Sequence, residues 1–144
     1  KTVKHLTKNK IKVVSHIGVT PQHYKNFNNI RSIGQNKKEQ ENLLTLAKKL
    51  EKAGSCMIVL ECMKGYAAKK ITRALSIPTI GIGASINCDG QILVINDLLC
   101  TDASLKKPRF IKSYVKLNTI VENAIKKYCK DVIDKKFPLK KNSY

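Results

Sequence analysis

Short, continuous apolar runs alternate with amphipathic segments along most of this chain. The runs at 11–17, 55–61 and 78–84 show no regular exchange of apolar and polar residues, which is typical of strands buried on both faces of a parallel sheet. Between them, residues 39–53 and 65–75 carry apolar side chains at the spacing of one helix face. Strands that alternate with helices in this way predict an α/β fold.

The flanking segments extend this pattern. Residues 2–9 predict the last turns of a helix, and residues 91–99 contain a fourth apolar run. Helical segments are predicted at 110–117 and 120–133. The stripe that the last helix is expected to bury consists of Val121, Ala124, Ile125, Tyr128 and Val132. Residues 19–35 predict a long loop, and long loops in compact domains are often functional.

Four strands of this kind are compatible with two architectures. They could form a small open sheet, or they could be half of an eight-stranded barrel. In both architectures, ligands bind beyond the carboxyl ends of the parallel strands. We therefore expect the functional site at the residues that follow the apolar runs.

Glu61 ends the second apolar run and is the leading candidate for an acid or base. Strand alternation places Met57, Val59 and Glu61 on one face of that strand. Ile58 and Leu60 fall on the other face. Apolar walls around a carboxyl group at this position would raise its pKa toward the working pH. The alternative is a solvated glutamate that begins a loop.

The next strand has small residues on one face. Thr79, Gly81 and Gly83 alternate along it. They would leave space for a ligand, or they would simply relieve crowding, and spacing alone does not decide between the two.

The formal net charge of +18 invites a comparison with nucleic-acid-binding proteins. All but three of the 28 basic residues are lysines, however, and they are spread along the chain. Arginine is better suited to bidentate contacts with phosphates and bases. No aromatic-rich strand or recognition-helix motif accompanies the lysines. We therefore expect weak, preference-free binding of polyanions at low salt and no specific nucleic-acid partner.

Five cysteines, an odd number, lack the close spacing of metal-ligand pairs. Cys56 and Cys62 lie on or beside a strand, where buried and reduced thiols are expected. No stretch of the sequence is long and apolar enough to cross a membrane, and no apolar leader run follows Lys1. We expect a cytoplasmic protein without a membrane partner, whose chain continues upstream of Lys1.

Five short blocks of this sequence match the motifs of one family. In chain order they are Ser15–Gln22, Ile58–Cys62, Ile77–Ala84, Asp89–Val94 and Pro108–Phe110. Together they resemble ketopantoate hydroxymethyltransferase, also called 3-methyl-2-oxobutanoate hydroxymethyltransferase. The order and spacing of the blocks make the resemblance specific, and it covers nearly the whole chain.

The resemblance implies a fold and a reaction. Residues 1–144 would be the C-terminal half of a single (β/α)₈ TIM-barrel domain, about strands five to eight. The family transfers a hydroxymethyl group from 5,10-methylenetetrahydrofolate to 3-methyl-2-oxobutanoate, giving 2-dehydropantoate on the route to pantothenate. It works as a homo-oligomer, typically a decamer.

The resemblance also implies roles for two residues. The block match makes Glu61 the proton acceptor that deprotonates the carbon beside the ketone. His16 matches a histidine at the end of the preceding strand, and we place it in the pocket, bound to the substrate or to an acidic neighbour. The alternative for His16 is a structural residue at the strand end. His5 and His23 are expected on the surface.

In the family, Mg²⁺ binds the keto acid and polarises its carbonyl. The resemblance places the acidic metal ligands, and a lysine that grips the keto acid, on strands that would precede Lys1. We therefore assign no metal ligand to this chain, and we expect Asp89, Asp97 and Asp102 to cap loops. Half a barrel would expose strand edges and an apolar face, so we expect this chain to be inactive by itself.

Three other interpretations stay open. The chain could be a degraded, non-catalytic relic of such an enzyme. It could belong to a related Mg²⁺-dependent keto-acid lyase or mutase barrel, whose activity would not need folate. It could also be a basic module that binds nucleic acid. Binding that prefers certain sequences and depends steeply on salt concentration would indicate such a module.

Overall fold

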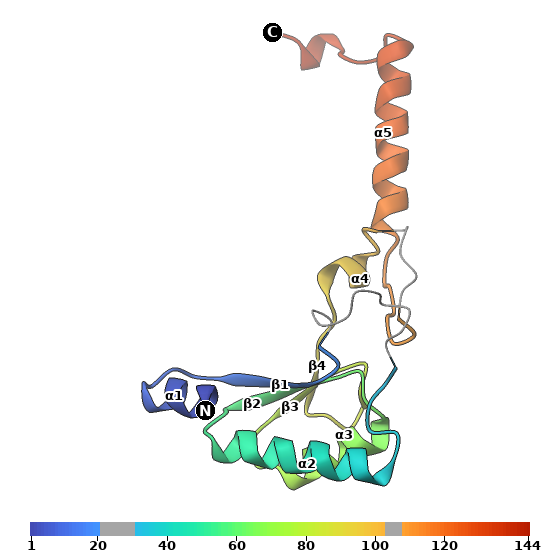
Figure 1. The fold of residues 1–144 in the computed structure, drawn as a ribbon. Helices are drawn as coiled ribbons and strands as arrows, with labels where there is room; N and C mark the ends of the chain where they lie inside the picture. The colour runs from blue at the N-terminus through green and yellow to red at the C-terminus, as the bar shows by residue number, and fades with distance from the viewer. Residues whose placement is uncertain (21–30, 103–107) are drawn as a thin grey trace. The chain divides into compact units, whose positions relative to one another are not determined.

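The computed structural model describes residues 1–20, 31–102 and 108–144 of the chain (Figure 1). Internal contacts divide the chain into two compact units. Unit 1 comprises Lys1–Leu93 with Pro108–Phe110, and unit 2 comprises Val94–Lys107 with Ile111–Tyr144.

Unit 1 is an α/β unit built on four parallel strands. Its elements are α1 (Thr2–Lys8), β1 (Val14–Gly18), α2 (Lys37–Lys52), β2 (Met57–Glu61), α3 (Gly65–Ala74), β3 (Thr79–Ile82) and β4 (Gly90–Gln91). The strands lie in the order β1-β2-β3-β4, and each neighbouring pair is parallel. The predicted α/β class is therefore confirmed, as are three strands and three helices within a few residues of their expected bounds.

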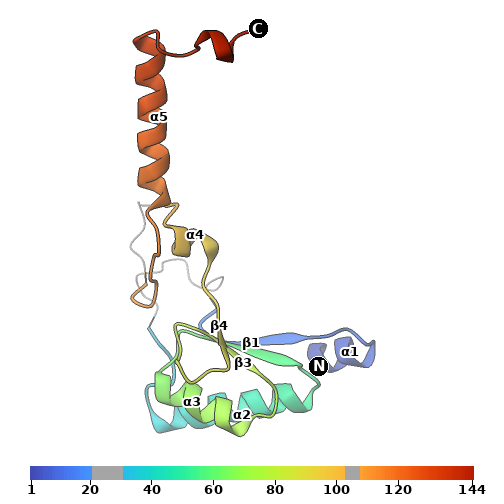
Figure 2. The same ribbon diagram turned by 180° about the vertical axis from the view of Figure 1, so that it is seen from behind.

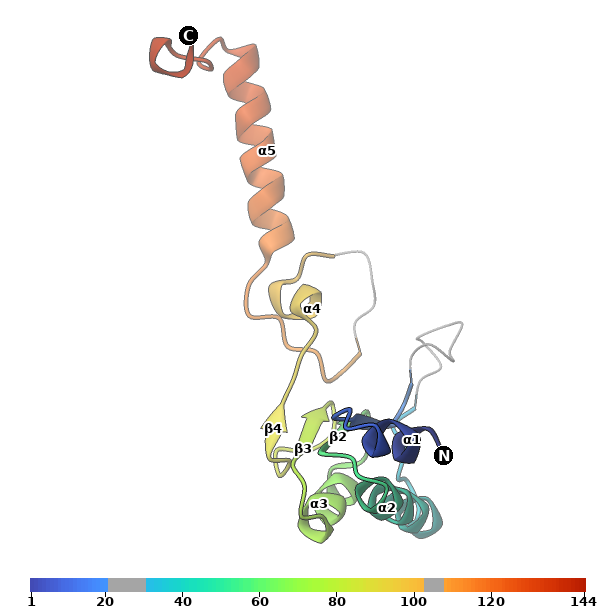
Figure 3. The same cartoon turned by 90° about the vertical axis from the view of Figure 1, so that its left-hand side faces the viewer.

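Helices α2 and α3 lie side by side on one face of the sheet (Figures 1 and 3). Ile58 and Leu60 point into the core on this face and are fully buried. The buried cluster beneath the two helices consists of Ile17, Ala47, Ile58, Leu60, Met63, Ala68, Ile71 and Cys88. The predicted alternation along β2 is confirmed, because Met57 and Val59 are less buried than the two residues that alternate with them.

The position of the helices bears on the choice of architecture. A doubly wound sheet carries helices on both faces, whereas a barrel carries them only on its outside. Figure 2 shows from behind that α2 and α3 cover the same side of the strands. Strands in chain order with helices on one face are consistent with half of a (β/α)₈ barrel.

The small residues of β3 do not line a ligand space. Thr79 pairs with Ile58 and Gly81 pairs with Leu60, so both lie on the face that the helices cover. Thr79 is fully buried, and its hydroxyl lies 2.8 Å from that of Thr72 on α3. A Cβ at Gly81 would lie 2.8 Å from the Gln91 side chain and 3.1 Å from Cys88 Sγ, and one at Gly83 would lie 2.5 Å from the Phe110 ring. The glycines therefore relieve crowding, and the interpretation of these small residues as room for a ligand is wrong.

The fourth apolar run is only partly a strand. Gly90 and Gln91 pair with β3, and α4 (Ile95–Leu99) of unit 2 begins soon afterwards. As an edge strand, β4 has a sheet neighbour on one side within the described residues. Ile92 and Val94 are about half exposed. The run therefore does not continue through them as a buried strand.

Unit 2 contains α4, α5 (Leu117–Ile133) and the short 3₁₀ helix η3 (Lys140–Asn142). The helix predicted at 110–117 is absent from its described residues, which have no helix at 111–116. The reason is a tertiary hydrogen bond, in which the Tyr114 N–H donates to the Leu98 carbonyl at 2.8 Å instead of to its own segment. The final helix is confirmed, but its expected core stripe is exposed along its length.

All five cysteines are free thiols. Cys56 is exposed and Cys62 is only partly buried, so the expectation that both are buried is wrong. Within the described ranges, no helix has the length and apolar character needed to span a bilayer.

Candidate functional site

Glu61 and His16 meet on the sheet face opposite the helices. Glu61 is the last residue of β2, and His16 is the central residue of β1. Because Gly18 pairs with Glu61 in the parallel register, His16 lies two residues earlier on the same face. The Nε2 atom of His16 lies 2.8 Å from Oε2 of Glu61. Two side chains that are 45 positions apart in the sequence thus form one pair at the carboxyl end of the strands.

The two members of this pair differ in burial. The Glu61 side chain is 12% exposed and that of His16 is 40% exposed. Glu61 is therefore the less solvated group, while the imidazole keeps contact with water.

Burial raises the pKa of Glu61 above its ordinary value. Desolvation is the largest cause, because water no longer stabilises the charged form. The charge of His16 and the hydrogen bond from His16 act in the opposite direction and lower the pKa in part. A carboxylate with a raised pKa is a stronger base than an exposed one, and a nearby imidazole keeps it ionisable.

The residue that follows Glu61 has an unusual backbone. Cys62 has a φ of 48°, which is uncommon for a residue that is not glycine. Burial raises the pKa of the Cys62 thiol, and the neighbouring charge of Glu61 adds to the effect. This thiol is therefore kept protonated, and it is poorly suited to act as a nucleophile.

The structure assigns clear places to the other residues that the sequence singled out. His5 is exposed on α1, as expected. Pro21, Gln22 and His23 lie outside the described residues. The sequence did not indicate that Gly18 contacts the backbone of Glu61. A glycine two residues after His16, at the end of the same strand, was the available signal.

Asp89 caps a strand rather than binding a metal. Its carboxylate accepts hydrogen bonds from the Thr79 N–H at 2.8 Å and from the Thr79 hydroxyl at 2.9 Å. These bonds hold the pKa of Asp89 below its ordinary value. Asp97 lies in the first turn of α4, and Asp102 is exposed, both in unit 2.

The described side chains do not fit a metal site. Over residues 1–20, 31–102 and 108–144, no three His, Cys, Asp or Glu side chains come together in a way that could hold a metal ion. Glu61 has a histidine as its near neighbour instead of a second carboxylate. We therefore derive no step of the chemistry through Mg²⁺.

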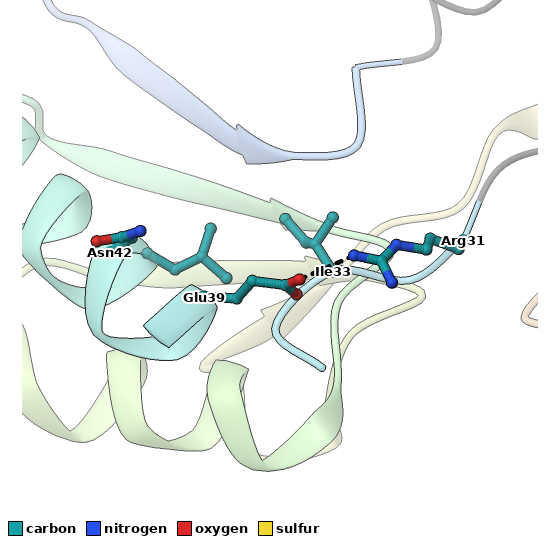
Figure 4. Close-up of a pocket in the computed structure, with 5 residues that line it drawn as sticks. Arg31, Ile33, Glu39 and Asn42 are labelled. Atoms are coloured by element: carbon teal, nitrogen blue, oxygen red, sulfur yellow. Dashed lines mark hydrogen bonds and ion pairs between the residues drawn. The ribbon is translucent and has the colours of Figure 1, made fainter. Parts of the chain in front are cut away.

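A shallow pocket of about 260 Å³ lies elsewhere, where the segment after residue 30 meets the start of α2 (Figure 4). Figure 4 shows the Arg31 guanidinium directed at the Glu39 carboxylate, and the two lie 2.8 Å apart. Glu39 also accepts the Gln35 N–H, and this bond is the main reason why its pKa lies below the ordinary value. The Asn36 side chain caps the helix by accepting the Glu39 N–H. These contacts order the start of α2, and they pair the two charged groups of the pocket with each other.

Known proteins match this chain over nearly its whole length. A family model described as ketopantoate hydroxymethyltransferase matches residues 1–140. Among curated relatives named 3-methyl-2-oxobutanoate hydroxymethyltransferase, that of Pelagibacter ubique (strain HTCC1062) is 46% identical over 142 residues, which is 99% of this chain and 53% of the relative. That of Bdellovibrio bacteriovorus is 40% identical, covering 100% of this chain and 54% of the relative.

An archaeal relative shows the same relationship. The protein of the same name from Saccharolobus islandicus (strain L.S.2.15 / Lassen #1) is 47% identical over 141 residues, which is 98% of this chain and 52% of the relative. The chain thus spans about half the length of the curated relatives it matches. The family model extends across nearly all of the chain, and the chain belongs to the ketopantoate hydroxymethyltransferase family.

Proposed function

We propose that the complete polypeptide carrying residues 1–144 transfers a hydroxymethyl group from 5,10-methylenetetrahydrofolate to 3-methyl-2-oxobutanoate, giving 2-dehydropantoate. The observation that carries the proposal is the buried Glu61 carboxylate paired with His16 at the carboxyl ends of the strands. Family membership supports the choice of reaction. The relatives' name specifies the keto acid and the hydroxymethyl group.

Glu61 is the proposed base. It takes the proton from C3 of the keto acid, and the electron pair of the broken C–H bond becomes that of the enolate. The enolate carbon forms a bond to the methylene carbon of the folate, and both C–N bonds of that carbon break. Water supplies the hydroxyl group, and its other proton, with the proton taken up by Glu61, goes to the two nitrogens of the tetrahydrofolate that leaves. The raised pKa of Glu61 supports this role, because a desolvated carboxylate gains more from accepting a proton.

His16 is proposed to orient this base. Its Nε2–H donates to Glu61 Oε2, which leaves the other carboxylate oxygen for the substrate proton. With 40% of its side chain exposed, His16 also lies within reach of a ligand arriving from solvent. We include in the proposal a homo-oligomeric, cytoplasmic enzyme, as the family resemblance implies.

The test is formation of 2-dehydropantoate by the complete polypeptide from the keto acid, methylenetetrahydrofolate and Mg²⁺. Product that depends on the folate supports the proposal. Consumption of the keto acid without folate would favour a related lyase or mutase barrel. A folded protein that gives no product under any of these conditions would point to a non-catalytic relic.

A further inference from the structure

The backbone around Glu61 is held from both neighbouring strands. The Val19 N–H donates to the Glu61 carbonyl at 3.1 Å, and the Cys62 N–H donates to the Ile82 carbonyl at 2.9 Å. A third bond, from the Ile33 N–H to the Cys62 carbonyl at 3.0 Å, holds the next peptide. Hydrogen bonds thus hold the end of β2 at consecutive positions. Val19 supplies the first of these donors and is 2% exposed.

Gly18 makes the closest of these approaches. It pairs with Glu61 and has a φ of +125°, which L side chains rarely adopt. A Cβ atom at this position would lie 2.1 Å from the Glu61 carbonyl oxygen and 2.9 Å from the Glu61 nitrogen. These neighbours are main-chain atoms in a hydrogen-bonded strand, and they cannot turn aside as a flexible side chain would. Any side chain at residue 18 must therefore move the Glu61 backbone away from β1.

Such a movement would change the position of the Glu61 carboxylate relative to His16. His16 lies two residues before Gly18 on the same strand, and its Nε2 lies 2.8 Å from the carboxylate. If the end of β2 separates from the end of β1, this hydrogen bond lengthens and water gains access to the carboxylate. The absence of a side chain at residue 18 thus sets both the partner and the burial of Glu61.

We propose that Gly18 is a positioning residue, whose close backbone contact with Glu61 places the carboxylate against His16 for proton abstraction. This inference rests on the proposed role of Glu61 as the base. Gly18 itself would touch no substrate. Its effect would pass through the main chain of Glu61.

The test is Gly18→Ala in the complete polypeptide, with Gly54→Ala as the matched control. Gly54 also has a positive φ, of +100°, and a Cβ there would lie 2.9 Å from the Thr7 side chain. It precedes β2, at the end of the strand away from Glu61. Both variants therefore introduce backbone strain and crowding, but only Gly18→Ala introduces them beside the carboxylate.

The first readout is exchange of the C3 proton of 3-methyl-2-oxobutanoate. We expect Gly18→Ala to lower kcat for exchange about 100-fold with KM nearly unchanged, because a small misplacement of a base costs about this factor. Gly54→Ala should leave kcat close to that of the parent. Equal kcat values in parent and Gly18→Ala would overturn the inference, as would an equal loss in both variants.

The second readout does not depend on catalysis. The carboxyl carbon of Glu61 is titrated by ¹³C NMR and assigned by its loss in Glu61→Gln. In Gly18→Ala both desolvation and the His16 contact weaken, and because desolvation is the larger influence, the pKa of Glu61 should move down toward its ordinary value. Gly54→Ala should leave it in place. If the parent exchanges no proton, the proposed function fails and this titration alone decides the role of Gly18. An unchanged titration, or a Gly18→Ala protein that does not fold, would overturn that role.

Discussion

At the scale of single residues, the account depends on how one carboxylate is solvated and partnered. Glu61 is buried, yet it retains a hydrogen bond to His16 at 2.8 Å. Desolvation and the His16 contact act on its pKa in opposite directions, and desolvation is the stronger. The net rise in pKa makes Glu61 a better base than a surface glutamate. Each of the two influences can be tested by its own experiment.

Removing the imidazole should raise the pKa of Glu61 further. In His16→Ala both lowering influences disappear, so the acid limb of the pH profile for C3 proton exchange should move to higher pH. His5→Ala, an exposed change on α1, is the control and should leave the profile unchanged. A limb that stays in place or moves to lower pH in His16→Ala would show that His16 does not act on this carboxyl group.

The same pKa shift makes a prediction about stability. Because the pKa of Glu61 is raised on folding, the folded state binds the proton more tightly than the unfolded state. The parent should therefore lose stability relative to Glu61→Gln as pH rises from about 4.3, the ordinary glutamate value, through the folded pKa. Denaturant unfolding of both proteins across this range measures the difference. If the parent instead became more stable relative to Glu61→Gln as pH rises, the result would contradict the burial of Glu61.

The sequence identified both residues of the pair and allowed His16 an acidic neighbour, but it did not specify that this neighbour is Glu61. Glu61 follows an apolar run and His16 lies near the end of another, so each could be assigned to a strand end. The 2.8 Å distance depends on the pairing of Gly18 with Glu61, and a shift by one residue would place the two side chains on opposite faces. Strand register is set by long-range packing, which local pattern does not contain.

At the scale of elements, prediction succeeded where burial and local pattern agree. Helices α2 and α3 and strands β1 and β2 carry apolar residues that pack together in one core, and their pattern was visible in the sequence. It failed at 110–117, where helical spacing is overruled by the bond from Tyr114 to Leu98. It also failed at 91–99, because β4 ends at Gln91 and the rest of the apolar run lies outside the strand.

Glu51 provides a test of how the elements are joined. Its carboxylate, near the end of α2, accepts the Ser76 N–H at 2.6 Å, the Ser76 hydroxyl at 2.8 Å and the Ile77 N–H at 3.2 Å. It thereby ties α2 to the turn between α3 and β3. Glu51→Ala should cost about 1 kcal/mol of unfolding free energy, because the bonds are exchanged for bonds to water. Glu41→Ala, at an exposed position on the same helix, is the control.

The contribution of Glu51 to stability should depend on pH in a direction set by its pKa. The hydrogen bonds from Ser76 hold the pKa of Glu51 below its ordinary value. The contribution of Glu51 should therefore be complete above the unfolded pKa of about 4.3 and should disappear as pH falls through the folded value. A difference between the parent and Glu51→Ala that grows toward acid pH would contradict this assignment.

At the scale of the whole molecule, apolar surface is left uncovered in the described residues. On α5, Val121, Ile125 and Tyr128 are about half exposed. In unit 1, Val14 is also about half exposed. Exposed apolar stripes of this kind mark surfaces that other protein segments cover. The chain also spans only about half the length of its curated relatives.

These surfaces predict the behaviour of residues 1–144 when they are produced alone. We expect self-association in sedimentation experiments under reducing conditions, strong binding of the dye ANS, and no formation of 2-dehydropantoate. The complete polypeptide should bind less dye per chain. A monomeric 144-residue chain that binds no dye and turns over substrate at ordinary rates would refute the proposal that it is an incomplete barrel.

The most direct measurement of the central claim is C3 proton exchange by Glu61→Gln in the complete polypeptide. Solvent deuterium is followed into 3-methyl-2-oxobutanoate by ¹H NMR, and binding of the keto acid is measured in parallel by calorimetry. The account predicts that exchange falls to the uncatalysed rate while the keto acid binds with nearly unchanged affinity. Exchange that persists at the parental rate would show that another group is the base.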